Sequence, residues 1–270
     1  MKKMMTAMTA MTLAMGLAGC AEENAETTAA ATEGASLAGT WKLDPASAQF
    51  ENATSSYVIA DGEYTCESCD PPYSVAADGE WQEVDRPGID GVKFTVVDDA
   101  TVTSASRMGE EQLGESTWTV SEDGQAMTVN WTNMGGDEVV EGSTMFERVA
   151  AGPDGSHAAS GEWKTVSVGE MSDAGLMVTY EVDGDTITYR GNGSGYTATL
   201  GGDPVPLEGD NAEGMIKIEK TGENTYRETY MRDGEAEGTL DLTIEGDTVS
   251  AVSTDLSDDS VVRWSATRQS

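Results

Sequence analysis

Apolar residues recur at every second position in many short segments of this chain, and no sustained helical spacing competes with them. The clearest sets are Val92, Phe94 and Val96; Met127, Val129 and Trp131; Val178, Tyr180 and Val182; and Leu240, Leu242 and Ile244. Successive side chains of a strand point to opposite faces, so a period of two indicates strands with one buried face. We therefore expect an all-β fold.

Asp-Gly pairs separate these alternating segments and favour tight hairpins. The second residue of such a pair accepts the positive φ that the turn requires. The pairs begin at Asp61, Asp78, Asp90, Asp123, Asp154, Asp183 and Asp233. Turns this frequent predict antiparallel strands joined in up-and-down order.

An internal repeat divides the chain into two similar units. The segment GTWKLD at Gly39 matches GEWKTV at Gly161, and the segment that begins at Val92 aligns with the one at Ile216. We expect one β unit over 37–150, a linker over 151–159 and a second β unit over 160–270. A single larger sheet or sandwich built from both repeats is the alternative.

Each unit begins with Gly-x-Trp and ends with an arginine on its last strand. This pattern resembles the lipocalin-like, or calycin, barrels. The resemblance implies two tandem up-and-down antiparallel barrels, each with the tryptophan of its first strand packed under a late arginine. Within each unit, the implied barrel-closing pairs are Trp41 with Arg148 and Trp163 with Arg268.

The N-terminus resembles the signal peptide of bacterial lipoproteins. Lys2 and Lys3 precede an apolar run that ends in Leu17-Ala18-Gly19-Cys20, which is similar to a lipobox. The resemblance implies removal of residues 1–19, lipidation of Cys20, for example with palmitate, and attachment to the membrane. Ala21 favours the outer membrane facing the periplasm, with the cell surface as another possible location. An ordinary signal peptide with a chance cysteine is the alternative.

The strongly acidic composition excludes one class of partner. The formal net charge is −34, and loss of residues 1–19 would remove two lysines and no acid, giving −36. Nucleic-acid phosphates require Lys and Arg, so we expect no nucleic-acid binding. Residues 20–36 lack large apolar side chains, which predicts a flexible acidic tether. The spread of acids indicates a solvated surface, with calcium binding as the alternative.

Cys66 and Cys69 are expected to form a local disulfide, because a secreted chain meets an oxidising compartment and Cys20 would carry lipid. Zinc needs four ligands, and no second cysteine pair exists. Redox activity of the pair is an alternative, although Glu67 and Asp70 disfavour a thiolate. We expect no metal and no cofactor.

Two classes of function fit these observations. One is a binding module that holds a small apolar ligand in a barrel mouth; the other is a structural or interaction lipoprotein with packed barrels. Fillers such as Trp118 and Trp131 favour packing in the first unit, whereas Ala198, Ala251 and Ser253 favour a small cavity in the second. No catalytic constellation is apparent, so we predict a protein that is not an enzyme.

Overall fold

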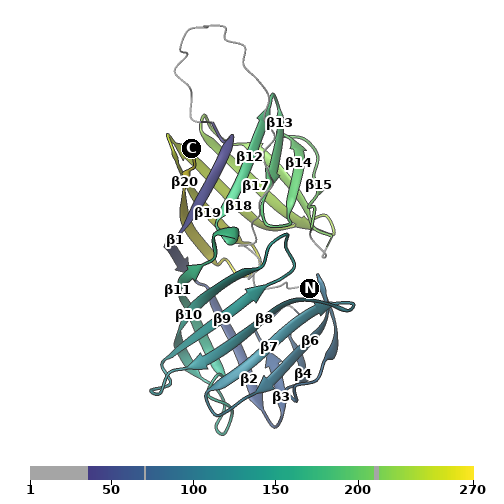
Figure 1. The fold of residues 1–270 in the computed structure, drawn as a ribbon, viewed down its shortest axis with the longest axis vertical. Helices are drawn as coiled ribbons and strands as arrows, with labels where there is room; N and C mark the ends of the chain where they lie inside the picture. The colour runs from purple at the N-terminus through teal and green to yellow at the C-terminus, as the bar shows by residue number, and fades with distance from the viewer. Residues whose placement is uncertain (1–35, 70, 210–212) are drawn as a thin grey trace.

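The computed structural model describes residues 36–69, 71–209 and 213–270, and within them the chain forms two antiparallel barrels. Each barrel is one sheet of ten strands that curls until its edges nearly meet. The barrels stack along the long axis of the molecule (Figure 1) and are called here the upper and the lower barrel. The expected all-β fold with two tandem barrels is confirmed.

The lower barrel is built from one continuous stretch of chain. Its strands are β2 (Thr54–Ala60), β3 (Glu63–Cys66), β4 (Tyr73–Ala76), β5 (Gln82–Arg86), β6 (Ile89–Val96), β7 (Thr101–Met108), β8 (Glu111–Val120), β9 (Ala126–Asn133), β10 (Val140–Ala151) and β11 (Gly161–Met171). Their order in the sheet is β4-β3-β2-β11-β10-β9-β8-β7-β6-β5. A bridge between Asp78 and Thr95 narrows the gap between the two edges.

The upper barrel combines the first strand of the chain with its last nine. The strands are β1 (Gly39–Glu51), β12 (Met177–Asp183), β13 (Thr186–Arg190), β14 (Gly195–Thr199), β15 (Val205–Pro206), β16 (Met215–Lys220), β17 (Thr225–Arg232), β18 (Glu235–Glu245), β19 (Thr248–Asp255) and β20 (Val261–Arg268). A short 3-10 turn, η1 (Asp173–Gly175), precedes β12. Their order is β14-β13-β12-β1-β20-β19-β18-β17-β16-β15, and a bridge between Gly195 and Glu208 joins the edges.

The two repeats exchange their first strands, which corrects the predicted units 37–150 and 160–270. Strand β1 comes from the first repeat but lies between β12 and β20 of the upper barrel. Strand β11 comes from the second repeat but lies between β2 and β10 of the lower barrel. The lower barrel is therefore an insertion between the first and second strands of the upper one.

The segment predicted as a linker explains the exchange. Residues 152–160 form the loop of a hairpin that joins β10 directly to β11. Consecutive strands pair readily because closing a short loop costs little conformational entropy. This hairpin commits β11 to the lower barrel, so β12 and β20 are left to pair with β1. The loop is also fixed in place, since the His157 backbone N–H donates to the Ile59 carbonyl at 2.8 Å.

The two barrels meet end to end at a waist. Strand β1 descends from the top of the upper barrel to the waist, and β11 rises from the bottom of the lower barrel to contact it (Figure 1). Loops bridge the waist as well, because the Asn192 side chain both donates to and accepts from the backbone of Glu138, at 2.7 and 2.9 Å. Each barrel encloses its own hydrophobic cluster.

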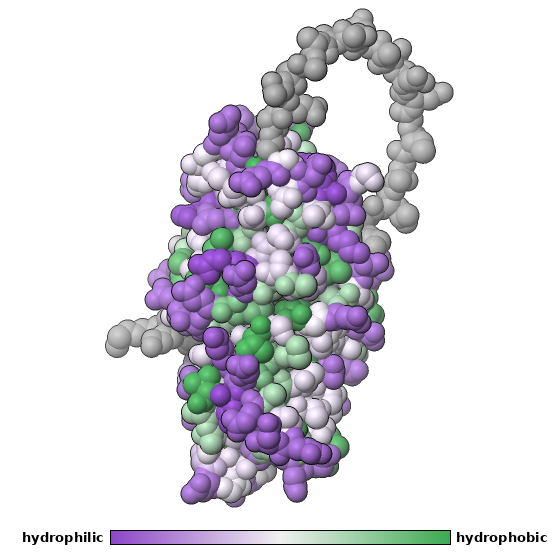
Figure 2. All heavy atoms as spheres, turned by 90° about the vertical axis from the view of Figure 1, so that its left-hand side faces the viewer, coloured by the Kyte–Doolittle hydropathy of each residue, from purple (hydrophilic) through white to green (hydrophobic). Residues whose placement is uncertain are grey.

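Polar residues cover most of the face that carries β10 and β11. Figure 2 shows this face, on which hydrophobic residues gather near the waist between hydrophilic upper and lower ends. Met145 and Val149 of β10 are among the exposed apolar side chains. Most large apolar residues are buried instead, as the period-two pattern predicts.

Candidate functional site

Each barrel is closed by a tryptophan under an arginine, with partners that differ from the prediction. The Arg268 guanidinium carbon lies 4.1 Å from the ring centre of Trp41, and that of Arg148 lies 3.9 Å from Trp163. The predicted pairs, Trp41 with Arg148 and Trp163 with Arg268, are wrong. The reason is the strand exchange, which carries each tryptophan into the barrel that contains the other repeat's arginine.

The two closures use the same hydrogen bonds. The indole N–H of Trp41 donates to the Leu37 carbonyl, and that of Trp163 donates to the Ala159 carbonyl, both at 2.9 Å. Arg148 donates to the carbonyls of Ser160 and Ala158 at 2.7 and 2.6 Å, while burial lowers the pKa of its guanidinium. These residues seal the far ends of the barrels and are structural.

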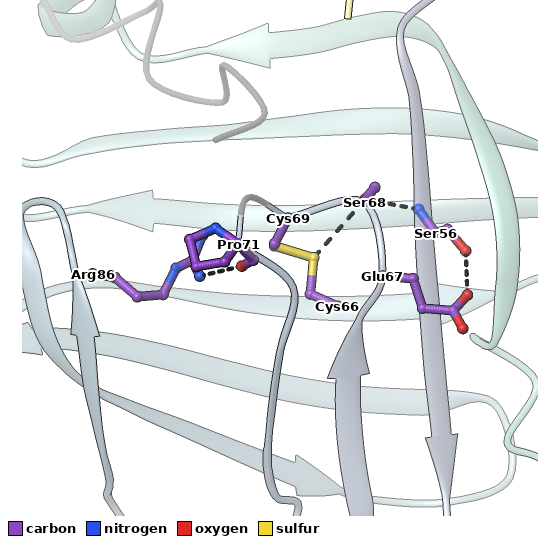
Figure 3. The surroundings of a disulfide bond; sticks show 7 residues. All are labelled: Ser56, Cys66, Glu67, Ser68, Cys69, Pro71 and Arg86. Atoms are coloured by element: carbon purple, nitrogen blue, oxygen red, sulfur yellow. Dashed lines mark hydrogen bonds between the residues drawn. A yellow bond between two sulfur atoms is a disulfide. The ribbon is translucent and has the colours of Figure 1, made fainter. Parts of the chain in front are cut away.

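The disulfide between Cys66 and Cys69 is confirmed. The S–S distance is 2.04 Å, and the bond links the end of β3 to the loop that leads to β4. Figure 3 shows the loop tied to its neighbours: the Ser56 N–H donates to Ser68 Oγ at 3.0 Å, and Arg86 donates to the Pro71 carbonyl at 2.8 Å. The two sulfurs are bonded to each other and hold the loop in place, so the disulfide has a structural role.

Aromatic rings fill the interior of the lower barrel. Tyr64 and Phe94 stack with ring centres 3.7 Å apart, and Trp118 contacts both of them edge-on. Tyr57 joins from β2, with its ring centre 5.0 Å from that of Trp118. Burial raises the pKa of the Tyr57 and Tyr64 phenols, so both rings stay neutral and pack as apolar groups.

A buried carboxyl group marks the interior of the upper barrel. Glu228 is 1% exposed, and its Oε1 accepts from the phenols of Tyr180 and Tyr196 at 2.8 and 2.6 Å. Its Oε2 accepts from Tyr230 at 2.8 Å, and Tyr189 packs against two of the tyrosines. Burial raises the pKa of Glu228, while the three phenol hydrogen bonds oppose the shift.

Sequence reasoning missed this network, although a signal was present. Glu228 alternates with Tyr226 and Tyr230 along β17, so it occupies an inward position of a period-two strand. A carboxyl group at such a position needs hydrogen-bond partners inside the barrel. Tyr230 is on β17 itself, but the other two partners come from β12 and β14, which only the closed sheet brings near.

A polar depression lies on the outer face of the lower barrel. Its volume is about 880 Å³, and it crosses β6 to β11. Outward hydroxyl and amide groups form much of its floor, namely those of Thr103, Thr117, Asn130, Thr132 and Ser143. Lys93 lies at the β6 side, and Glu141 and Glu170 lie at the β10 and β11 side. Such a surface offers hydrogen-bonding groups next to apolar atoms, among them those of Ala105, Trp131 and Met171.

Cys20 lies outside the described residues. Within the described part of the chain, helical structure offers no segment with the length and apolar character needed to cross a membrane. The same described residues contain no group of three or more His, Cys, Asp or Glu side chains placed to hold a metal ion. Comparison with protein-family models, curated proteins and solved structures found no match.

Proposed function

We propose that this protein is a lipid-anchored lipoprotein of the bacterial cell envelope that acts as a non-catalytic binding module. Each barrel has a packed interior, and the outer depression of the lower barrel is the proposed binding face. The anchor is a lipid on Cys20, joined to the body by an acidic tether. The outer membrane facing the periplasm is the proposed location, following the residue Ala21 after the cysteine.

The filling of both interiors carries this proposal. In the lower barrel the rings of Tyr57, Tyr64, Phe94 and Trp118 contact one another where a lumenal ligand would lie. In the upper barrel the lumenal positions hold a carboxyl group and tyrosines, which suit a small apolar ligand poorly. The outer depression, in contrast, is open and lined by groups that bind polar molecules.

The anchor is tested by replacing the lipidated residue. Cys20→Ser should abolish labelling with radioactive palmitate and move the protein from the membrane fraction to the soluble fraction. A mutant that is still labelled and still sediments with membranes contradicts the anchor.

The binding face is tested with the soluble body, residues 21–270, and washed envelope fragments from cells that lack the protein. Thr117→Tyr fills the depression with a side chain that strands accept, so binding should fall at least severalfold. The matched control is Thr243→Tyr, an outward threonine of β18 in the upper barrel. Equal binding by wild type and Thr117→Tyr, or uptake of one fluorescent fatty acid per barrel, contradicts the proposal.

A further inference from the structure

Two cationic side chains lie over the ring of Trp81, on the outer face of the lower barrel and beside the depression. The Lys93 ammonium lies 5.2 Å from the ring centre of Trp81, and the Arg107 guanidinium carbon lies 4.8 Å from it. Lys93 alternates with the buried Val92 and Phe94 on β6, so it points outward. Trp81 immediately precedes β5 and packs over this outer face.

Neither cation has an anionic partner among the described residues. The chain holds 49 acidic and 15 basic residues, so acids are abundant, yet the ion pairs of the described chain involve other cations. Arg107 Nε is buried and packs against Gly91, and it makes no hydrogen bond to any residue in the described part of the chain. Glu115, two strands from Lys93, instead accepts from the side-chain amide of Gln112 at 3.0 Å.

Unpaired cations in an acidic protein indicate a site for an external anion. The charges of the Lys93 ammonium and the Arg107 guanidinium meet no carboxylate among the described residues, and a charge-assisted hydrogen bond to an external carboxylate would compensate them. Lys93 belongs both to this cluster and to the wall of the depression. The rest of a ligand whose anionic group is bound here would therefore lie in the depression. The hydroxyl and amide groups of that surface complement the hydroxyls of a sugar.

We propose that the depression binds an acidic saccharide, with one carboxylate held by Lys93 and Arg107 beside Trp81. This rests on the assignment of the depression as the binding face. The neutral part of the saccharide would lie along Thr103, Thr117 and Asn130. The formal charge of −34 repels polyanions at long range, so the ligand carries an isolated acid and not a continuous run of them.

The test compares a trisaccharide with one terminal glucuronate and its methyl ester, which has the same sugars and no charge. Calorimetric titration should give binding about tenfold tighter for the acid, the gain expected from a charge-assisted contact worth about 1.4 kcal/mol. Lys93→Gln with Arg107→Gln should bring the two ligands within about twofold of each other. Arg227→Gln is the control, because Arg227 is an outward arginine already paired with Asp241 at 2.7 Å.

The outcomes separate this inference from the proposed function. Equal binding of the acid and the ester by wild type overturns the acidic-saccharide site. The same holds if the double variant still prefers the acid and binds it as tightly as wild type does. If envelope fragments still bind in a Thr117-dependent way, the depression remains a binding face. If neither saccharide nor envelope binds, both proposals fail. Thermal unfolding of each variant checks that altered binding does not reflect an unfolded barrel. If the double variant is unfolded, Lys93→Gln alone, which leaves Arg107 in place, takes its place in the titration.

Discussion

Glu228 places a carboxyl group inside the upper barrel, where water cannot solvate its charge. Four tyrosines from β12, β13, β14 and β17 surround it, and three of them donate hydrogen bonds to it. The phenols themselves have raised pKa values, because burial and the nearby carboxyl both disfavour their ionisation. Within this network Glu228 is therefore the group that titrates first.

Replacing Glu228 should remove a pH dependence of stability. Its folded-state pKa is raised above the ordinary 4.5. The folded state thus holds this proton more tightly, and its contribution to stability is present below pH 4.5 and lost as pH rises through the folded pKa. Denaturant unfolding from pH 3.5 to 8 should show the free energy of wild type falling relative to Glu228→Gln across that window. A constant difference between the two curves contradicts this.

The closing tryptophans should each stabilise the barrel that contains them, and not the repeat that encodes them. Trp41→Ala should destabilise the upper barrel and Trp163→Ala the lower one, each by about 3–5 kcal/mol for a fully buried ring. Hydrogen exchange measured by mass spectrometry locates the effect. Faster exchange in β12–β20 for Trp41→Ala, with β2–β10 unchanged, is expected. Faster exchange in β2–β10 for that variant would contradict the exchanged pairing.

Among the elements, β1 and β11 show where sequence reasoning succeeds and where it fails. The alternation of apolar residues predicted the strands, and Gly-x-Trp correctly predicted their positions at the start of each repeat. The choice of barrel was missed because both strands begin with Gly-x-Trp-Lys and present the same inward tryptophan. Either strand fits either barrel, and the hairpin loop at 152–160 decides between them.

The loop between β3 and β4 illustrates a feature that the sequence predicted correctly, from the spacing of its cysteines and the predicted secretion signal. Two cysteines three residues apart, with no other described cysteine to pair with, leave a local bridge as the simple outcome. The candidate binding face was not predictable in the same way. Its threonines are ordinary outward strand residues, and only the sheet order places them beside Lys93 and Trp81.

Removing the disulfide should have a small effect. A bridge across so few residues removes little entropy from the unfolded chain, about 2 kcal/mol or less in the chain-entropy model. Cys66→Ser with Cys69→Ser should therefore lower the melting temperature by only a few degrees. Calorimetry of the double variant and of the reduced wild type measures this. A loss of several kcal/mol, or zinc bound in stoichiometric amount, would contradict a purely structural role.

For the whole molecule, the exchange determines which fragments can fold. Residues 52–172 contain every strand of the lower barrel and should fold alone, with a β circular dichroism spectrum and a cooperative melt. Residues 37–150 lack β11 and should expose the edges of β2 and β10, so this fragment should aggregate or remain unfolded. Residues 160–270 lack β1, so this fragment should also aggregate or remain unfolded.

Mixing 37–150 with 160–270 provides the decisive control. Each fragment supplies the strand that the other barrel lacks, so the mixture should regain β structure and a cooperative transition. A fusion of 37–51 to 173–270 should likewise restore the upper barrel alone. Independent folding of 37–150 and 160–270, with no gain on mixing, would contradict the exchanged strands.

The exchanged first strand also links folding to the order of synthesis. The lower barrel has all its strands once Met171 is made, whereas β1 gains its second neighbour only when β20 is complete at Arg268. At 5–20 residues per second, the remaining hundred or so residues take roughly 5–20 s to make. During that interval Trp41 and Leu43 stay exposed to chaperones and proteases. Loss of β20 would leave β1 paired with β12 alone, so the fate of the first strand of this barrel depends on synthesis of its last strand.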